Sequence, residues 1–109
     1  MTQINLGVAY STLAEVRDKE ENIKRAIEAY EEALKTYTVE RYPVNYATTQ
    51  NNLGTAYRNL AEVREKEENL KRAIEAYEET LKIYTANEYP LLHETVMSNL
   101  EKARLMASS

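Results

Sequence analysis

The sequence predicts an all-α protein, an α-solenoid of five helices stacked as antiparallel pairs. Its composition is the first reason: 109 residues include only two Gly and two Pro, whereas Ala, Glu, Lys and Leu, which lose little conformational freedom in a helix, are abundant. Secondly, apolar residues recur at helical spacing, and runs that alternate with a period of two are absent. Thirdly, the chain contains an internal repeat of the length that stacked helical units have.

The repeat has a period of 47 residues. Residues 2–38 align with residues 49–85, and 29 of these 37 pairs are identical; the pairs differ at residues 4, 8, 11, 12, 18, 23, 33 and 36. A weaker third copy starts at Tyr89-Pro90, where Thr95, Asn99, Leu100 and Ala103 match Thr48, Asn52, Leu53 and Ala56. Stacked units bury an apolar face only against their neighbours. We therefore expect one domain over 1–109, with repeat 1 at about 1–42, repeat 2 at about 43–89 and a C-terminal capping helix at about 90–109.

Each repeat contains two amphipathic patterns, and each pattern predicts one helix. In repeat 2 the buried stripes consist of Gln50, Leu53, Tyr57, Leu60, Ala61 and Arg64, then of Leu70, Ala73, Ile74, Tyr77, Leu81 and Tyr84. Tyr-Pro pairs separate the units, because the residue before Pro avoids the helical region while Pro itself suits a first turn. The expected helices lie near residues 2–17, 20–38, 44–64, 67–85 and 91–106.

The junctions inside each repeat contain neither Gly nor Pro. Asp18 with Glu21 is a candidate capping box, and Glu65 is a poorer cap. A helix that ran without interruption through residues 15–22 would indicate domain swapping in place of a hairpin. Gly7 and Gly54 lie inside helices, where Gly costs about 1 kcal/mol relative to Ala, so we expect another helix to approach closely there.

The third copy changes two of these positions, since Glu101 stands where Gly54 would be and Arg104 stands where Tyr57 would be. A terminal helix that packs on one side only explains both changes. Residues 90–109 therefore resemble a cap, although Leu105 and Met106 leave open a longer array.

The repeat resembles the tetratricopeptide-repeat family. The residues that carry the resemblance are Leu6-Gly7, Tyr10, Ala26, Tyr30 and Pro43, and again Leu53-Gly54, Tyr57, Ala73, Tyr77 and Pro90. The departures are Gln3 and Gln50 in place of Trp, Tyr in place of Phe, Thr80 where repeat 1 has Ala33, and a period longer than the usual ~34. The chain is similar to long-repeat members from bacteria and archaea. The resemblance implies a right-handed superhelix whose first helices line a concave surface that binds proteins or peptides.

Composition argues against several other classes of function. A net charge of −4 and a pI near 5.1 disfavour nucleic acid, which needs clustered Lys and Arg. We see no signal peptide and no membrane span, and the chain has no Cys, so a cytoplasmic protein is expected. His93-Glu94 is followed by Met97 where a zinc-binding H-E-x-x-H motif needs a second His. We expect no metal, no cofactor and no enzyme, because no nucleophile, base and orienting group occur together.

Glutamates beside lysines and arginines predict a solvated face. The expected i,i+4 ion pairs are Glu20-Lys24, Glu21-Arg25 and Glu31-Lys35, each worth about 0.2–0.5 kcal/mol. The repeat-signature residues Tyr10, Tyr30, Tyr57 and Tyr77 are expected in the core, with their hydroxyls at a wet edge.

The differences between the two copies point to a ligand-binding face. In the first helices they are Ile4/Asn51, Val8/Thr55, Ser11/Arg58 and Thr12/Asn59, which share one arc at about 100° per residue. Relaxed solvent exposure would give the same pattern, and the family resemblance favours ligand binding. The predicted peptide-binding residues are Asn51, Asn52, Thr55, Arg58 and Asn59, with Lys102 beyond them.

The leading hypothesis is therefore a non-catalytic protein–protein interaction module that takes a protein or peptide ligand in the groove of the first helices. The alternative is a self-assembling structural element, a homo-oligomer through exposed end helices or domain swapping, or a duplicated or engineered repeat. For self-association the predicted residues are Ile4 and Val8, on a first helix without an upstream neighbour.

Overall fold

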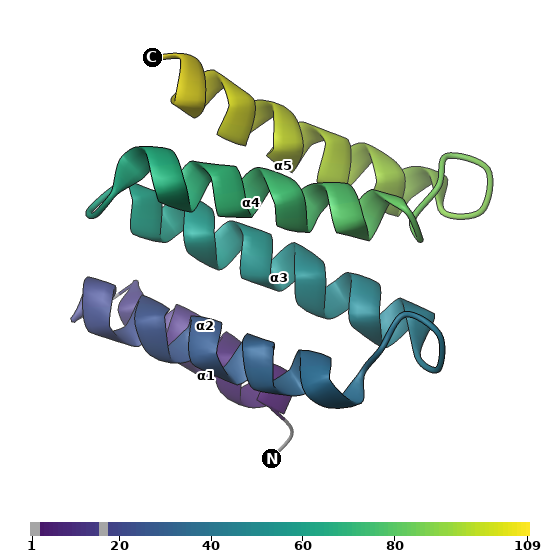
Figure 1. Ribbon diagram of the computed structural model, residues 1–109, viewed down its shortest axis with the longest axis horizontal. Coiled ribbons are helices and arrows are strands. Elements are labelled where there is room, and N and C mark those ends of the chain that lie inside the picture. The colour runs from purple at the N-terminus through teal and green to yellow at the C-terminus, as the bar shows by residue number, and fades with distance from the viewer. Residues whose placement is uncertain (1–2, 16–17) are drawn as a thin grey trace.

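Five helices make up the structure, a computed structural model that describes residues 3–15 and 18–109. They are α1 Gln3–Ala14, α2 Lys19–Thr36, α3 Pro43–Ala61, α4 Lys66–Leu81 and α5 Pro90–Ser108 (Figure 1). No strand occurs among the described residues. The all-α prediction and the number of helices are confirmed.

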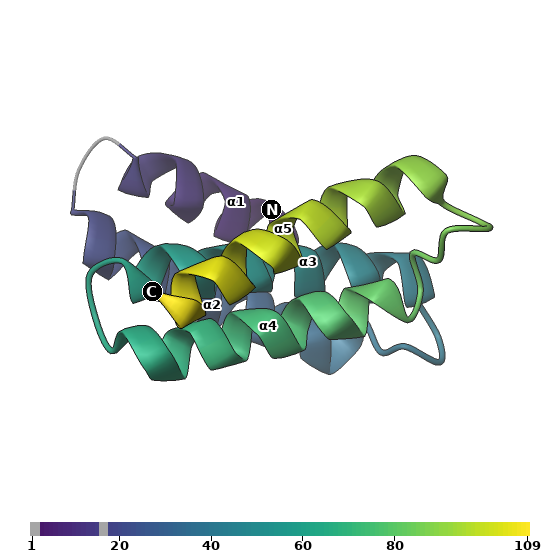
Figure 2. The same ribbon diagram turned by 90° about the horizontal axis from the view of Figure 1, so that it is seen from above.

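The helices form two hairpins and one closing helix. α1 pairs with α2, α3 pairs with α4, and the hairpins join because α2 packs on α3 and α4 packs on α5. α3 touches α1 and α5 only narrowly. Figure 2 shows the resulting layers, with α1 above α2 and α3 above α4. The chain therefore stacks one unit on the next, and its two ends lie at opposite ends of the stack in Figure 1.

Most helix ends differ from the predicted ones by a few residues. α2 ends at Thr36 and not at 38, α3 at Ala61 and not at 64, and α4 at Leu81 and not at 85, whereas α5 continues to Ser108. α2 stops because Tyr37 leaves the helical region at φ −89°, ψ 85° while its amide still bonds Ala33 O. The prediction for residues 2, 16 and 17 lies outside the described residues.

The turns inside the hairpins depend on backbone conformation, and the predicted capping box is wrong. Asp18 and Glu65 adopt the left-handed region, with φ 46° and 42°, and neither makes a side-chain cap. Each of these residues is the N-cap of the next helix, and its carbonyl accepts the first helical hydrogen bond: Asn22 N donates to Asp18 O at 2.9 Å, and Asn69 N donates to Glu65 O at 3.0 Å. The left-handed residue breaks the helix, so the hairpin prediction is confirmed.

Both glycines allow a tyrosine of the partner helix to approach α1 or α3. A Cβ on Gly54 would lie 2.8 Å from Tyr77 Cε1, and a Cβ on Gly7 would lie closer still to Tyr30. Because such contacts are tighter than real side chains show, only glycine fits here. The prediction of a close helix approach at these two positions is confirmed.

The tyrosines are in or against the core, as predicted. Tyr30, Tyr57 and Tyr77 are buried, and Tyr10 packs against the cluster from a half-buried position. Tyr57 also links the hairpins, because its hydroxyl donates to Glu31 Oε2 at 3.0 Å.

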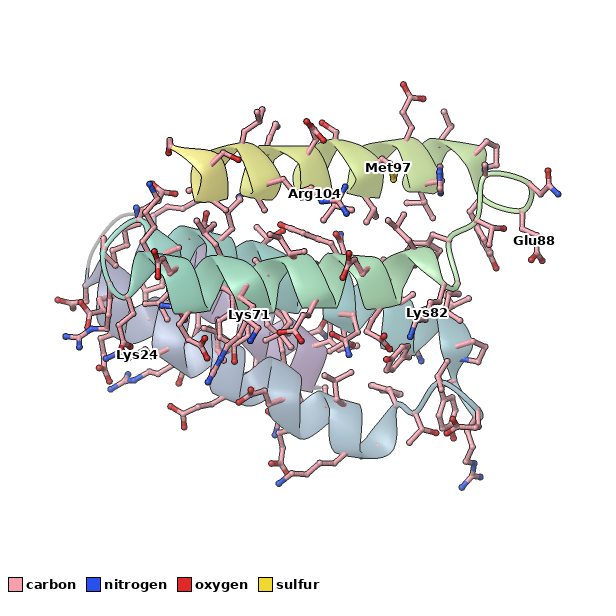
Figure 3. The ribbon with its side chains drawn as sticks, turned by 45° about the horizontal axis from the view of Figure 1, so that its top comes forward. Lys24, Lys71, Lys82, Glu88, Met97 and Arg104 are labelled. Atoms are coloured by element: carbon pink, nitrogen blue, oxygen red, sulfur yellow. The ribbon has the colours of Figure 1, made fainter. Side chains whose placement is uncertain are left out.

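The terminal helix repeats this link with different chemistry. Arg104, which replaces tyrosine in the third copy, bonds Glu78 at 3.4 Å from the side of α5 that faces α4 (Figure 3). Glu101 is exposed, which agrees with a closing helix that has no further partner helix among the described residues.

The ion pairs follow the predicted pattern in two of three cases. Lys24 bonds Glu20 at 3.0 Å, and Arg25 bonds Glu21 at 3.2 Å. The predicted Glu31-Lys35 pair is wrong: Lys35 bonds Glu32 instead, because Glu31 is engaged by the tyrosine of the next hairpin.

Candidate functional site

The predicted binding residues of α3 occupy neighbouring sides of one helix. Asn51, Thr55 and Arg58 follow at intervals of four and three, so they form a single line that we call the α3 stripe. Asn59 and Asn52 lie to one side of this line, and together the five positions span an arc of about 120°. All five side chains are half-buried, which places them at the edge of the packed interior and not on a fully solvated face.

Thr55 of the α3 stripe is engaged inside the protein. Its hydroxyl lies 2.8 Å from the hydroxyl of Tyr77 on α4. In the first hairpin the equivalent tyrosine, Tyr30, has its contact with Ser11 at 3.5 Å. Burial raises the pKa of both Tyr30 and Tyr77, because a buried phenolate loses its hydration. The hydroxyls of Tyr30 and Tyr77 therefore each have one hydroxyl partner, on α1 and α3 respectively.

The other two residues of the α3 stripe carry polar atoms without a partner. Asn51 Oδ1 and Arg58 Nη1 are buried, and no hydrogen bond within the protein satisfies either atom. Leaving a buried polar group unsatisfied costs about 1–3 kcal/mol, and more for a charged one. One atom is an acceptor and the other a donor, so a ligand with both functions can satisfy the pair.

A hollow of about 330 Å³ lies beside the stripe, between α1 and α3. Its lining combines small and apolar side chains with polar ones: Ser11, Ala14, Glu15, Lys19, Ile23, Ala56 and Asn59. Of the predicted site residues, Asn59 alone contributes to it. At the matching junction between α3 and α5, Arg58 and Met106 stand in the places of Ser11 and Asn59. The smaller Ser11 and Asn59 at this junction, compared with Arg58 and Met106 at the next, are the sequence feature that indicates this hollow.

Lys102 and the predicted self-association residues lie apart from the α3 stripe. Lys102 is exposed and lines a shallow hollow built from α5 alone, with Leu91, Glu94, Thr95, Ser98 and Asn99. Ile4 is half-buried and Val8 is 46% exposed, at the α1 positions that correspond to Asn51 and Thr55. The open end of the stack is lined by other residues of α1, among them Leu6 and Tyr10.

His93 has a structural contact, since its Nδ1 lies 2.9 Å from Tyr84 O at the start of α5. Within residues 3–15 and 18–109, no group of three His, Cys, Asp or Glu side chains could hold a metal ion. In the same part of the chain no helix has both the length and the apolar character to cross a bilayer.

Comparison with known proteins gives one family. Residues 47–83 match the family model for the tetratricopeptide repeat, and this segment covers most of α3, the turn after it and the whole of α4. Neither the curated proteins nor the solved structures gave a match. The match confirms the resemblance on the second hairpin, and the 29 identical pairs extend the same pattern to the first.

Proposed function

We propose that this chain, which carries a tetratricopeptide repeat at residues 47–83, is a non-catalytic interaction module that binds an extended protein segment along the α3 stripe. The repeat family suggests an interaction with proteins. The observation that carries the binding site is the pair of buried atoms without partners, Asn51 Oδ1 and Arg58 Nη1. Tetratricopeptide repeats are interaction modules and do not as a rule perform catalysis, which fits this proposal.

The spacing of the two residues suits an extended peptide. Seven residues of α-helix advance about 10.5 Å along the axis, and three residues of extended chain advance about 10 Å. A peptide N–H can therefore donate to Asn51 Oδ1 while a carbonyl or an acidic side chain three residues away accepts from Arg58 Nη1. Such a ligand would supply the two hydrogen bonds that the protein itself does not provide.

Binding by this stripe should be weak and sensitive to salt. No aromatic or large aliphatic side chain projects from the stripe, and such anchors dominate tight interfaces. A half-buried guanidinium that pairs with an acidic group gives an affinity that falls as ionic strength rises. Asn52 and Asn59 on the flank offer further amides to a peptide backbone.

The test is a selection from a random peptide library on the wild-type chain, with counter-selection on the Asn51→Leu, Arg58→Leu double variant. Selected peptides should bind the wild type and lose at least about tenfold in affinity on the double variant, equivalent to about 1.4 kcal/mol. Arg41→Leu is the matched control, because Arg41 is exposed in the loop before α3 and its loss should leave binding unchanged.

Amide chemical shifts locate the contact. Perturbations should cluster at residues 51–59. Shifts confined to the α4 region, residues 67–85, together with a neutral effect of Arg58→Ala, would refute the groove proposal and leave the outer surface as the contact face.

Self-assembly is the second candidate, favoured by large apolar side chains that remain exposed on α1 and α5. Val8 is 46% exposed, Leu105 62% and Leu91 80%. Exposed apolar side chains of this size can form a contact between copies. Sedimentation velocity over a range of concentrations tests this, and Ile4→Lys with Val8→Lys should weaken a dimer that forms through α1. A strict monomer at millimolar concentration contradicts this candidate.

A further inference from the structure

We infer that the outer face of the α1–α2 hairpin, at the N-terminal end of the stack, is a docking surface for an amphipathic helix. This helix carries an aliphatic residue and, four positions later, a glutamate. This end face is separate from the α3 stripe. It is lined by residues of both helices, among them Leu6 and Tyr10 of α1 and Arg25, Glu28 and Ala29 of α2. The inference is independent of the peptide groove proposed above.

The first observation is that this face has the same residues as a second face, which another helix of the protein covers. All eight residues that line the open face recur unchanged 47 positions later, on α3 and α4. Their counterparts on α3, Leu53 and Tyr57, are 7% and 6% exposed because α2 packs on them. Leu6 and Tyr10 on the open face are only half-buried. The same surface residues are thus present twice. The copy on α3 and α4 is covered by α2, and no helix of the described residues covers the copy on α1 and α2.

The second observation is that the open face already holds the side-chain arrangement of the covered one. Arg72 lies over the ring of Tyr57 at 5.7 Å and bonds Glu68 at 3.4 Å. At the open face Arg25 lies over Tyr10 at 5.8 Å and bonds Glu21 at 3.2 Å. Because these contacts exist without a covering helix, docking requires little further ordering of side chains.

The covered copy also shows which chemistry the face accepts. The helix that covers it is α2, where Ile27 is 7% exposed and lines the groove with Tyr57. One turn further on α2, Glu31 accepts a hydrogen bond from the Tyr57 hydroxyl at 3.0 Å. At the open face the equivalent donor is the hydroxyl of Tyr10. A docking helix therefore needs an aliphatic residue for the apolar floor and a glutamate at i+4 for this hydroxyl.

Charge favours a basic residue elsewhere on the docking helix. The open face carries three glutamates and one arginine, so its formal charge is −2. On α2, Lys24 stands three residues before Ile27 and lines the same groove as Arg72. The pattern K-x-x-I-x-x-x-E of α2, the helix that covers the equivalent face, is thus the sequence that we expect in the docking helix.

The experiment uses an 18-residue peptide that copies α2, Lys19–Thr36, with blocked ends. It is added to the isotope-labelled full chain, and amide shifts are recorded. A control peptide has serine at the positions of Ile27 and Glu31 and is otherwise identical. We expect the first peptide to shift Leu6, Tyr10 and Ala29 with saturation, and the control peptide to bind at least tenfold more weakly.

Variants of the chain test the contact from the other side. Tyr10→Phe should weaken the peptide about tenfold through loss of the hydrogen bond to its glutamate. Leu6→Glu should abolish binding, because it places a like charge opposite that glutamate. Leu105→Glu puts the same charge on an exposed position of α5, at the other end of the stack, and should leave binding unchanged.

Four outcomes of the peptide titration would overturn the inference. They are the absence of shifts on this face, shifts centred on Asn51 and Arg58, equal binding of the two peptides, and shifts throughout α1 that show exchange of the peptide for α2 itself. Concentration-dependent shifts of the same residues without any peptide would assign the face to a second copy of the chain and would also contradict a separate helix as occupant.

Discussion

Gly54→Ala should destabilise the protein, although alanine is the better helix former. The substitution removes a glycine from the middle of α3, and in an open helix this gains about 1 kcal/mol. Here the added methyl group would lie 2.8 Å from Tyr77 Cε1 and 2.9 Å from Tyr77 Cδ1. Tyr77 is fully buried, so its ring has no open space into which it can turn.

The magnitude follows from two opposing effects. Overpacking of a well-packed core costs about 1–3 kcal/mol. Displacement of the ring also weakens the 2.8 Å hydrogen bond between Tyr77 and Thr55, which is worth about 1 kcal/mol. After the helix-propensity gain is subtracted, a net loss of about 1–3 kcal/mol in the free energy of unfolding remains. The melting temperature should fall by about 4–8 °C for each kcal/mol.

Urea unfolding followed by circular dichroism measures this loss. A double-mutant cycle with Tyr77→Leu supplies the control: without the ring, Gly54→Ala should become neutral or stabilising, and the two substitutions should not be additive. If Gly54→Ala alone raises the stability, or if the two effects add, then the close approach of Tyr77 to α3 is not the reason for the glycine.

Three further predictions concern other parts of the fold. Glu65→Gly should stabilise by about 0.5–1 kcal/mol, since it relieves a left-handed glutamate, whereas the control Glu67→Gly, inside α4, should destabilise; equal melting temperatures would contradict this. Tyr57→Phe should cost about 0.5–1.5 kcal/mol in urea unfolding through the lost link to α2, and an equal loss in Tyr10→Phe, on the open end, would contradict it. Burial and a neighbouring carboxylate raise the pKa of Tyr46 to about 12, so its contribution to stability is present below pH 10 and is lost between about pH 10 and 12; an ultraviolet titration in which Tyr46→Phe removes no late-titrating tyrosine would refute this.

The helical stack could be predicted because the sequence contains the same helical pattern twice. Period, amphipathic spacing and the Tyr-Pro pairs together define five helices, and the two glycines identify where a second helix must come close. The inner turns could not be predicted in the same way. Glu65 adopts a left-handed conformation that glutamate does not favour, and Asp18, whose residue type tolerates this region, adopts it without a Gly or Asn to indicate it in the sequence.

The contacts between the hairpins could not be predicted from the spacing of neighbouring residues either. Glu31 had an obvious partner one turn away, yet it accepts a hydrogen bond from Tyr57, 26 residues later. Local charge spacing gives exposed pairs of small energy, and a buried phenol that needs an acceptor outweighs them. For the same reason the partnerless atoms of Asn51 and Arg58 follow from packing and not from spacing.

The divergence between the two copies has a physical cause that joins the fold to the proposed site. In the first hairpin the buried Tyr30 hydroxyl contacts Ser11, whereas in the second the Tyr77 hydroxyl contacts Thr55. In the second copy the tyrosine hydroxyl is contacted from the position of Val8, which is Thr55, and no longer from the position of Ser11. The position of Ser11 is therefore not needed for this contact in the second copy, where it is Arg58. The change of valine to threonine at one site thus permits the change of serine to arginine at the other. A duplication that only relaxed its exposed face would not couple the two changes. Their coupling explains why the helix flanked by both α1 and α5 tolerates arginine at position 58, where the first hairpin needs serine.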